Sequence, residues 1–132
     1  MFYINNEFLN ILDFKVIDSL SFHFLDMKVK FITIKNECEI IRISIHELLY
    51  ATVDGSLVSC HIEDGDKFCC SMTLRSLVER LPEAFILINR SCLVNSSKVR
   101  KFHRQKREVT LSDASVHKVS SRKVKNLTDK LE

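Results

Sequence analysis

Glycine and proline are scarce in this chain. Its 132 residues include two glycines and one proline, which leaves little room for flexible linkers or low-complexity tails. Two glycines also cannot build the glycine-rich loop that cradles phosphates in nucleotide-binding enzymes. At this length we expect one domain with a hydrophobic core large enough to fold without disulfides or metals.

Membrane and export signals are also missing. No uninterrupted apolar run approaches the roughly 20 residues that a membrane-spanning helix needs, and the start, MFYINNEFLNILDF, lacks the basic stretch of a secretory signal. The cysteines are odd in number, show no CxxC spacing and lie mostly in apolar, strand-like runs: Cys38, Cys60, Cys69, Cys70 and Cys92. We expect reduced, buried thiols in a cytoplasmic protein that does not bind membranes.

A convergent set of catalytic or metal-binding residues is absent. The five histidines do not have the spacing of metal ligands, and the sequence contains neither HExxH nor CxxC. Cys60 and His61 are neighbours on an expected strand, so their side chains point to opposite faces and cannot form a catalytic pair. We therefore expect no enzyme, no cofactor and no metal site.

Strand patterns dominate the middle of the sequence. From Lys28 to Met72, short runs rich in Ile, Val, Phe and Cys alternate with polar turns. DG at 54–55 and EDGD at 63–66 have the turn chemistry expected between neighbouring strands. A spacing of about ten residues between runs favours antiparallel sheets over β-α-β units.

A helix is predicted where this pattern changes. In SMTLRSLVERLP the apolar residues recur at helical spacing, at Leu74, Leu77, Val78 and Leu81. Ser71 or Thr73 can cap the start of this helix, and Pro82 ends it.

The second half of the chain predicts more strands and a last helix. AFILI is strand-like, KVRKF and REVTL flank a polar HRQK tip as in a hairpin, and SVHKVS is one further strand. SSRKVKNLTDKLE places Val124, Leu127 and Leu131 on one face of a short amphipathic helix. The first 27 residues fit a helix, a strand or both.

Charge is unevenly distributed along the sequence. Residues 1–88 carry 8 Lys and Arg against 13 Asp and Glu, a net charge of −5, whereas residues 89–132 carry 12 against 4, a net charge of +8. Such asymmetry is typical of a protein with a polyanionic partner, although a solvated basic surface would also produce it.

Two basic segments could contact nucleic acid. In INRSCLVN, Asn89, Arg90 and Ser91 lie at the end of the AFILI strand, and arginine is the usual donor to guanine edges. At the start of the last helix, Arg122 and Lys123 lie near backbone N–H groups that suit a phosphate. The basic hairpin KVRKFHRQKREV could bind phosphates too, but basic residues on strand edges also prevent edge-to-edge pairing.

These segments resemble the LytTR domain, the DNA-binding output module of many bacterial response regulators. The family signature, an aromatic residue followed by His-Arg-Ser and Val-Asn, corresponds here to FILINRSCLVN, with Asn89 in place of the histidine. TLRSLVERLP precedes it, as in the family. ISIHELLYATVDGSLVSCHIEDGDKF and KVSSRKVKNL resemble the upstream and terminal sections. The resemblance covers residues 28–131.

The resemblance implies a mainly β fold of about ten short strands in small stacked antiparallel sheets with one or two short helices. It also implies a transcription regulator that inserts loops into successive major grooves of double-stranded DNA. The implied contact residues come from three regions and are Ser56, Leu57, Asn89, Arg90, Ser91, Ser121, Arg122, Lys123 and Lys125.

Family members bind paired direct repeats, so the resemblance also implies two copies, as a homodimer on DNA. We expect residues 1–27 to form an apolar N-terminal extension and residues 28–132 to form the DNA-binding domain. The alternative is a non-enzymatic protein-interaction module that uses the apolar N-terminal segment and does not bind DNA.

Overall fold

The computed structural model describes residues 31–35 and 37–132. The described residues form ten β-strands, namely β1 (Phe31–Lys35), β2 (Ile40–Ser44), β3 (Leu48–Asp54), β4 (Leu57–Ile62), β5 (Lys67–Cys70), β6 (Phe85–Asn89), β7 (Cys92–Asn95), β8 (Val99–His103), β9 (Glu108–Leu111) and β10 (Val116–Lys118). Two short α-helices in the same part of the chain are α2 (Leu74–Glu79) and α3 (Val124–Leu131). Three single 3-10 turns accompany them, namely η2 (Ile45–Glu47), η3 (Ser96–Lys98) and η4 (Ser121–Lys123).

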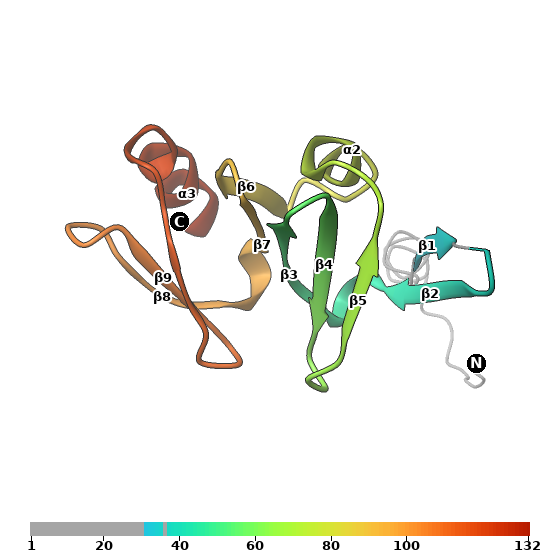
Figure 1. The fold of residues 1–132 in the computed structure, drawn as a ribbon. Helices are drawn as coiled ribbons and strands as arrows, with labels where there is room; N and C mark the ends of the chain where they lie inside the picture. Colours follow the sequence, from blue (N-terminus) through green and yellow to red (C-terminus); the bar gives the residue numbers. More distant parts are fainter. Residues whose placement is uncertain (1–30, 36) are drawn as a thin grey trace, which may run out of the picture. The chain divides into compact units, whose positions relative to one another are not determined.

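The strands make three small antiparallel sheets (Figure 1). β1 and β2 pair as a hairpin, the central sheet has the order β5-β4-β3-β7-β6, and the third has the order β10-β9-β8. Within the sheets, paired strands are consecutive in the chain except β3 and β7, whose pairing places Tyr50 opposite Val94. The mainly β fold that the resemblance implied is confirmed.

The central sheet is buried on both faces. All four residues of β7 are buried, and alternate side chains on a strand point to opposite faces. Leu93 belongs to a core cluster with Leu77 of α2 and apolar residues of β1 and β2. Val94 belongs to a second cluster with Leu111 of β9 and Leu127 of α3. The β6–β7 hairpin is therefore held between two cores.

Helix α2 forms where the sequence periodicity predicted it. The Thr73 hydroxyl oxygen accepts a hydrogen bond from the Ser76 backbone N–H at 3.0 Å, and such a cap stabilises a helix by about 1 kcal/mol. Leu74 and Leu77 are buried against the central sheet. The helix ends before Pro82, whose ring cannot continue it.

The expectation that the thiols are buried is only partly correct. Cys60, Cys70 and Cys92 are buried, whereas Cys38 and Cys69 are exposed. β5 is an edge strand, and along it the side chain of Cys69 points to solvent while that of Cys70 points into the core. The alternation of side chains along an edge strand thus exposes Cys69, although cysteine is usually a buried residue type.

The predicted extension at residues 1–27, and the start of the predicted domain at residues 28–30, lie outside the described residues. Within residues 31–35 and 37–132, no helix is long and apolar enough to cross a membrane.

Candidate nucleic-acid interface

The β6–β7 turn carries the Asn-Arg-Ser triplet. Asn89 ends β6 and pairs with Cys92 at the start of β7, so Arg90 and Ser91 form a two-residue turn between them. The side chains of Arg90 and Ser91 are exposed, and Asn89 is half-buried. The turn therefore presents the guanidinium group to solvent at the tip of a hairpin whose strands are fixed in the core.

The Asn89 amide holds this turn in place. Its Nδ2 donates a hydrogen bond to the Lys118 carbonyl at 2.7 Å, and its Oδ1 accepts one from the Ser91 backbone N–H at 2.7 Å. Both ends of the amide are thus used within the protein. Asn89 shapes the turn and ties it to β10, while Arg90 remains available.

Two backbone hydrogen bonds connect the turn to the other predicted contact regions. The Val53 N–H donates to the Ser91 carbonyl at 3.0 Å, and the Ser120 N–H donates to the Ile88 carbonyl at 2.8 Å. The first bond joins the end of β3, and the second joins the segment leading into α3. The β3–β4 turn, the β6–β7 turn and the start of the last helix consequently lie on the same side of the described unit, at the top in Figure 1.

The β3–β4 turn supplies the first predicted region. Gly55 has φ +66°, a left-handed conformation that glycine adopts without strain. Ser56 and Leu57 follow it and are exposed, with 42% of Leu57 accessible. Together with Arg90 they line one open cleft of about 410 Å³. The structure thus brings the first and second predicted regions to a shared cavity.

A single 3-10 turn precedes the last helix. The chain first makes the 3-10 turn η4, and the hydroxyl of Ser120 before it makes no capping hydrogen bond. Ser121 and Arg122 are exposed on this turn, Lys123 is half-buried, and Lys125 is exposed in the first turn of α3. The basic residues predicted at the start of the last helix are present there.

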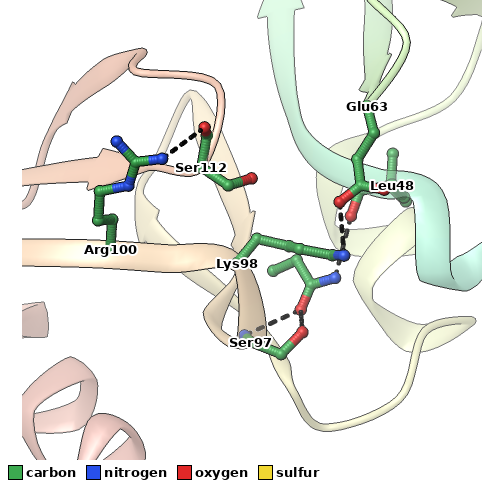
Figure 2. Close-up of polar contacts among 7 residues, drawn as sticks. Leu48, Glu63, Ser97, Lys98, Arg100 and Ser112 are labelled. Atoms are coloured by element: carbon green, nitrogen blue, oxygen red, sulfur yellow. Dashed lines mark hydrogen bonds and ion pairs between the residues drawn. The ribbon is translucent and has the colours of Figure 1, made fainter.

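Some basic residues are already engaged in structural contacts. Figure 2 shows Lys98, whose Nζ lies 2.6 Å from the Glu63 carboxylate, and Arg100, which donates to the Ser112 carbonyl at 3.3 Å. An exposed ion pair of this kind contributes about 0–1 kcal/mol to stability. These two members of the basic hairpin have protein partners, which favours the structural interpretation for this part of it.

The side chains of Arg90, Arg122, Lys123 and Lys125 differ in this respect. Within the described part of the chain, none of the four makes a side-chain hydrogen bond or ion pair. Their positive charges are therefore available to an external anion.

Asn95, which closes the INRSCLVN segment, has a structural role that sequence reasoning missed. It is 3% exposed. Its Nδ2 donates to the Leu48 carbonyl at 3.0 Å, and its Oδ1 accepts from the Ser97 N–H at 3.0 Å and hydroxyl at 2.7 Å (Figure 2). An asparagine directly before Ser-Ser was an available signal, because asparagine is a favoured cap.

A second unpredicted group lies on β3, β4 and β10. The Tyr50 ring lies between two histidines, with its centroid 4.2 Å from those of His61 and His117. The Nε2 atom of His117 is 2.9 Å from the Ser115 hydroxyl. Burial lowers the pKa of both histidines, and the nearby Asp113 carboxylate opposes that shift. Neutral rings therefore pack here near pH 7.

The described residues give little support for cysteine catalysis or metal binding. Burial raises the pKa of the Cys60 and Cys92 thiols to about 12, so they are poor nucleophiles at neutral pH. Among the residues with described positions, no three His, Cys, Asp or Glu side chains are arranged to hold a metal ion.

Comparisons with known proteins identify the family and the fold. The family model of the LytTr DNA-binding domain matches residues 38–132. Among solved structures, the fold is similar to the LytTr DNA-binding domain of a protein described as a methyl-accepting/DNA response regulator from Bacillus cereus. The TM-score is 0.66 at 16% identity, over 76% of this chain and 95% of that one. The search of curated proteins gave no match.

Proposed function

Because the chain belongs to the family of LytTR DNA-binding domains, which are not enzymes, we propose that it regulates transcription by binding a specific sequence in double-stranded DNA. Residues 28–132 form the DNA-binding domain in this proposal, and residues 1–27 form an extension with a separate role. The protein acts in the bacterial cytoplasm, where it meets chromosomal DNA.

One observation carries this proposal. The turn that presents Arg90 is hydrogen-bonded to the strands that lead into the other two regions, to the Val53 N–H at the end of β3 and to the Lys118 carbonyl at the end of β10. These hydrogen bonds hold the three exposed loops on one side of the described unit. Loops fixed in this way are suited to entering grooves, because their ordering cost has been met by folding.

Arg90 is the proposed base reader of the second region. Its guanidinium is exposed and has no partner in the described part of the chain, and arginine can donate two hydrogen bonds to guanine O6 and N7. Asn89 and Ser91 support it, Asn89 by holding the turn. In the first region, Ser56 can donate to a base or phosphate, and Leu57 can contact a thymine methyl group.

The third region combines reading and anchoring. Arg122 is exposed on η4 and reads a second groove or its rim. Lys123 and Lys125 contact phosphates near the start of α3, where the helix dipole is positive. Ser121 adds a hydroxyl donor beside them. Two copies of the chain bind paired direct repeats, and they form a homodimer on that DNA.

Binding constants for a duplex carrying the preferred motif and for a scrambled duplex test these roles. Arg90→Ala should reduce discrimination between the two duplexes by about 1–3 kcal/mol, because a bidentate base contact is lost. Lys123→Ala should weaken both duplexes alike and reduce the salt dependence. If wild type binds neither duplex in a salt-dependent way, the protein-interaction alternative replaces this proposal.

A further inference from the structure

The cleft between the β3–β4 turn and the start of α2 contains a basic residue that the three predicted regions omit. This open cleft of about 410 Å³ is lined by Ser56 and Leu57 from the turn, by Thr73 and Arg75 from the start of α2, and by Arg90. Arg75 was unremarkable in the sequence, because an exposed arginine on an amphipathic helix is normally solvated. Its place in the fold puts it on the same cavity as the proposed base reader.

The charge on this cleft is entirely positive. Two of its lining side chains are arginines, and none of its lining residues is acidic. Neither Arg75 nor Arg90 makes a side-chain hydrogen bond or ion pair with the residues whose positions are described. By contrast, Arg80 just after the same helix donates to the Thr33 carbonyl at 3.1 Å. Two unpaired guanidinium groups on one cavity favour an anion there.

The polar groups of the cleft suit a phosphate. The Thr73 oxygen already accepts from the Ser76 N–H, so its hydroxyl proton remains free to donate outward. Ser56 offers a second hydroxyl, and Arg75 offers guanidinium N–H groups in the planar fork that matches phosphate oxygens. Leu57 and the other apolar lining residues give a surface against which a deoxyribose can pack.

The position and openness of the cleft identify the source of that phosphate. Besides the start of α2, it is lined by residues of the β3–β4 turn and by Arg90 of the β6–β7 turn, two of the loops proposed to enter DNA grooves, and its mouth is open to solvent. A small organic anion would remain largely exposed there, whereas ligand pockets usually cover most of their ligand. We propose that Arg75 is a further DNA contact, which binds a backbone phosphate in this cleft while Arg90 reads the adjacent bases. This inference rests on the proposed function.

The test compares Arg75→Gln and Arg75→Lys with Lys67→Gln in the full chain. Lys67 is an exposed cation at the start of β5, at the opposite end of β4 from the β3–β4 turn. Lys67→Gln therefore makes the same change in net charge away from the cleft. Binding is measured by titration against salt, using a duplex with the motif selected by the wild type and a scrambled duplex. Circular dichroism and thermal unfolding establish that each variant is folded.

Loss of one phosphate contact has a defined signature. The slope of log K against log salt should fall in magnitude by about 0.9 for Arg75→Gln. The ratio of wild-type to variant affinity should therefore rise about eightfold when the salt concentration is lowered from 1 M to 0.1 M. Both duplexes should be affected alike. Arg75→Lys keeps the charge and should retain the wild-type salt slope, and Lys67→Gln should match the wild type. Ethylation of one phosphate should block wild type but no longer affect Arg75→Gln.

Other outcomes overturn the inference in distinguishable ways. If Arg75→Gln binds like Lys67→Gln while Arg90→Ala still loses discrimination, the proposed function stands and the phosphate contact is wrong. If Arg75→Gln changes the preferred sequence, Arg75 reads a base instead. If wild type itself prefers no sequence, the proposed function fails first.

Discussion

Removing the Asn89 side-chain amide should remove the hydrogen bonds that hold the β6–β7 turn in place. The amide makes two hydrogen bonds of 2.7 Å, to the Lys118 carbonyl and from the Ser91 N–H. A hydrogen bond of this kind contributes about 1 kcal/mol net, so Asn89→Ala should lower the free energy of unfolding by about 2 kcal/mol. With an unfolding entropy of about 2.1 cal/mol/K per residue over about 100–130 residues, that is a decrease in Tm of roughly 7–10 °C.

Asn89→Asp separates the two hydrogen bonds. The carboxylate can still accept from the Ser91 N–H, but it cannot donate to the Lys118 carbonyl and faces it with a negative charge. The protonated acid can donate, so folding should raise the pKa of the new carboxyl. A raised carboxyl pKa means that the folded state binds more protons, so the stability deficit should shrink as the pH falls below about 5.

Urea unfolding measures both variants, and the same samples are titrated with the preferred duplex. If ordering the β6–β7 turn on DNA costs the variant about 1.4 kcal/mol of binding free energy, its affinity falls about tenfold. If Asn89→Ala unfolds at the wild-type urea concentration and binds DNA with wild-type affinity, the amide does not hold the turn. A deficit in Asn89→Asp that is independent of pH would show that the contact with Lys118 contributes nothing.

Three further outcomes follow from the geometry. Asn95→Ala should lower the free energy of unfolding, measured in urea, by about 2–4 kcal/mol, because the buried Leu48 carbonyl loses the hydrogen bond from the Asn95 amide. The folded pKa values of His61 and His117 lie below 6.5, so the unfolded chain binds more protons in mild acid. Stability should therefore be complete above pH 6.5 and fall as the pH drops below it, and replacing both histidines by Gln should flatten that dependence. Cys60 and Cys92 should react with a thiol reagent only as fast as the protein opens. Labelling followed by mass spectrometry measures these rates, and reaction of either cysteine at the rate of a free thiol would contradict this expectation.

Local patterns predicted the elements but could not predict how they meet. The apolar spacing in SMTLRSLVERLP gave α2, and runs of β-branched residues gave the strands. The pairing of Tyr50 with Val94 joins β3 to β7 across 44 positions of sequence (94 − 50), and no local pattern encodes it. Helical spacing likewise did not predict the 3-10 turn that the chain makes before α3 begins.

The candidate interface shows the same limit. Charge and the resemblance selected Arg90 and Arg122, and the structure leaves both exposed. The function of the Asn89 amide could not be read from its neighbours, since its acceptor is the carbonyl of Lys118, 29 residues later. Arg75 was missed because a helix periodicity indicates only that a residue faces outward, not which loops lie beside it.

Selection of bound duplexes from a random DNA pool, with wild type and Arg90→Ala in parallel, tests the central claim most directly. If the three loops read DNA through the β6–β7 turn, wild type should enrich a short motif repeated in direct orientation. The Arg90→Ala pool should lose preference at one position of that motif, because a guanine contact is gone. An identical motif from both proteins would contradict the role of Arg90. No enrichment by wild type, with only salt-sensitive general binding, would contradict sequence-specific recognition.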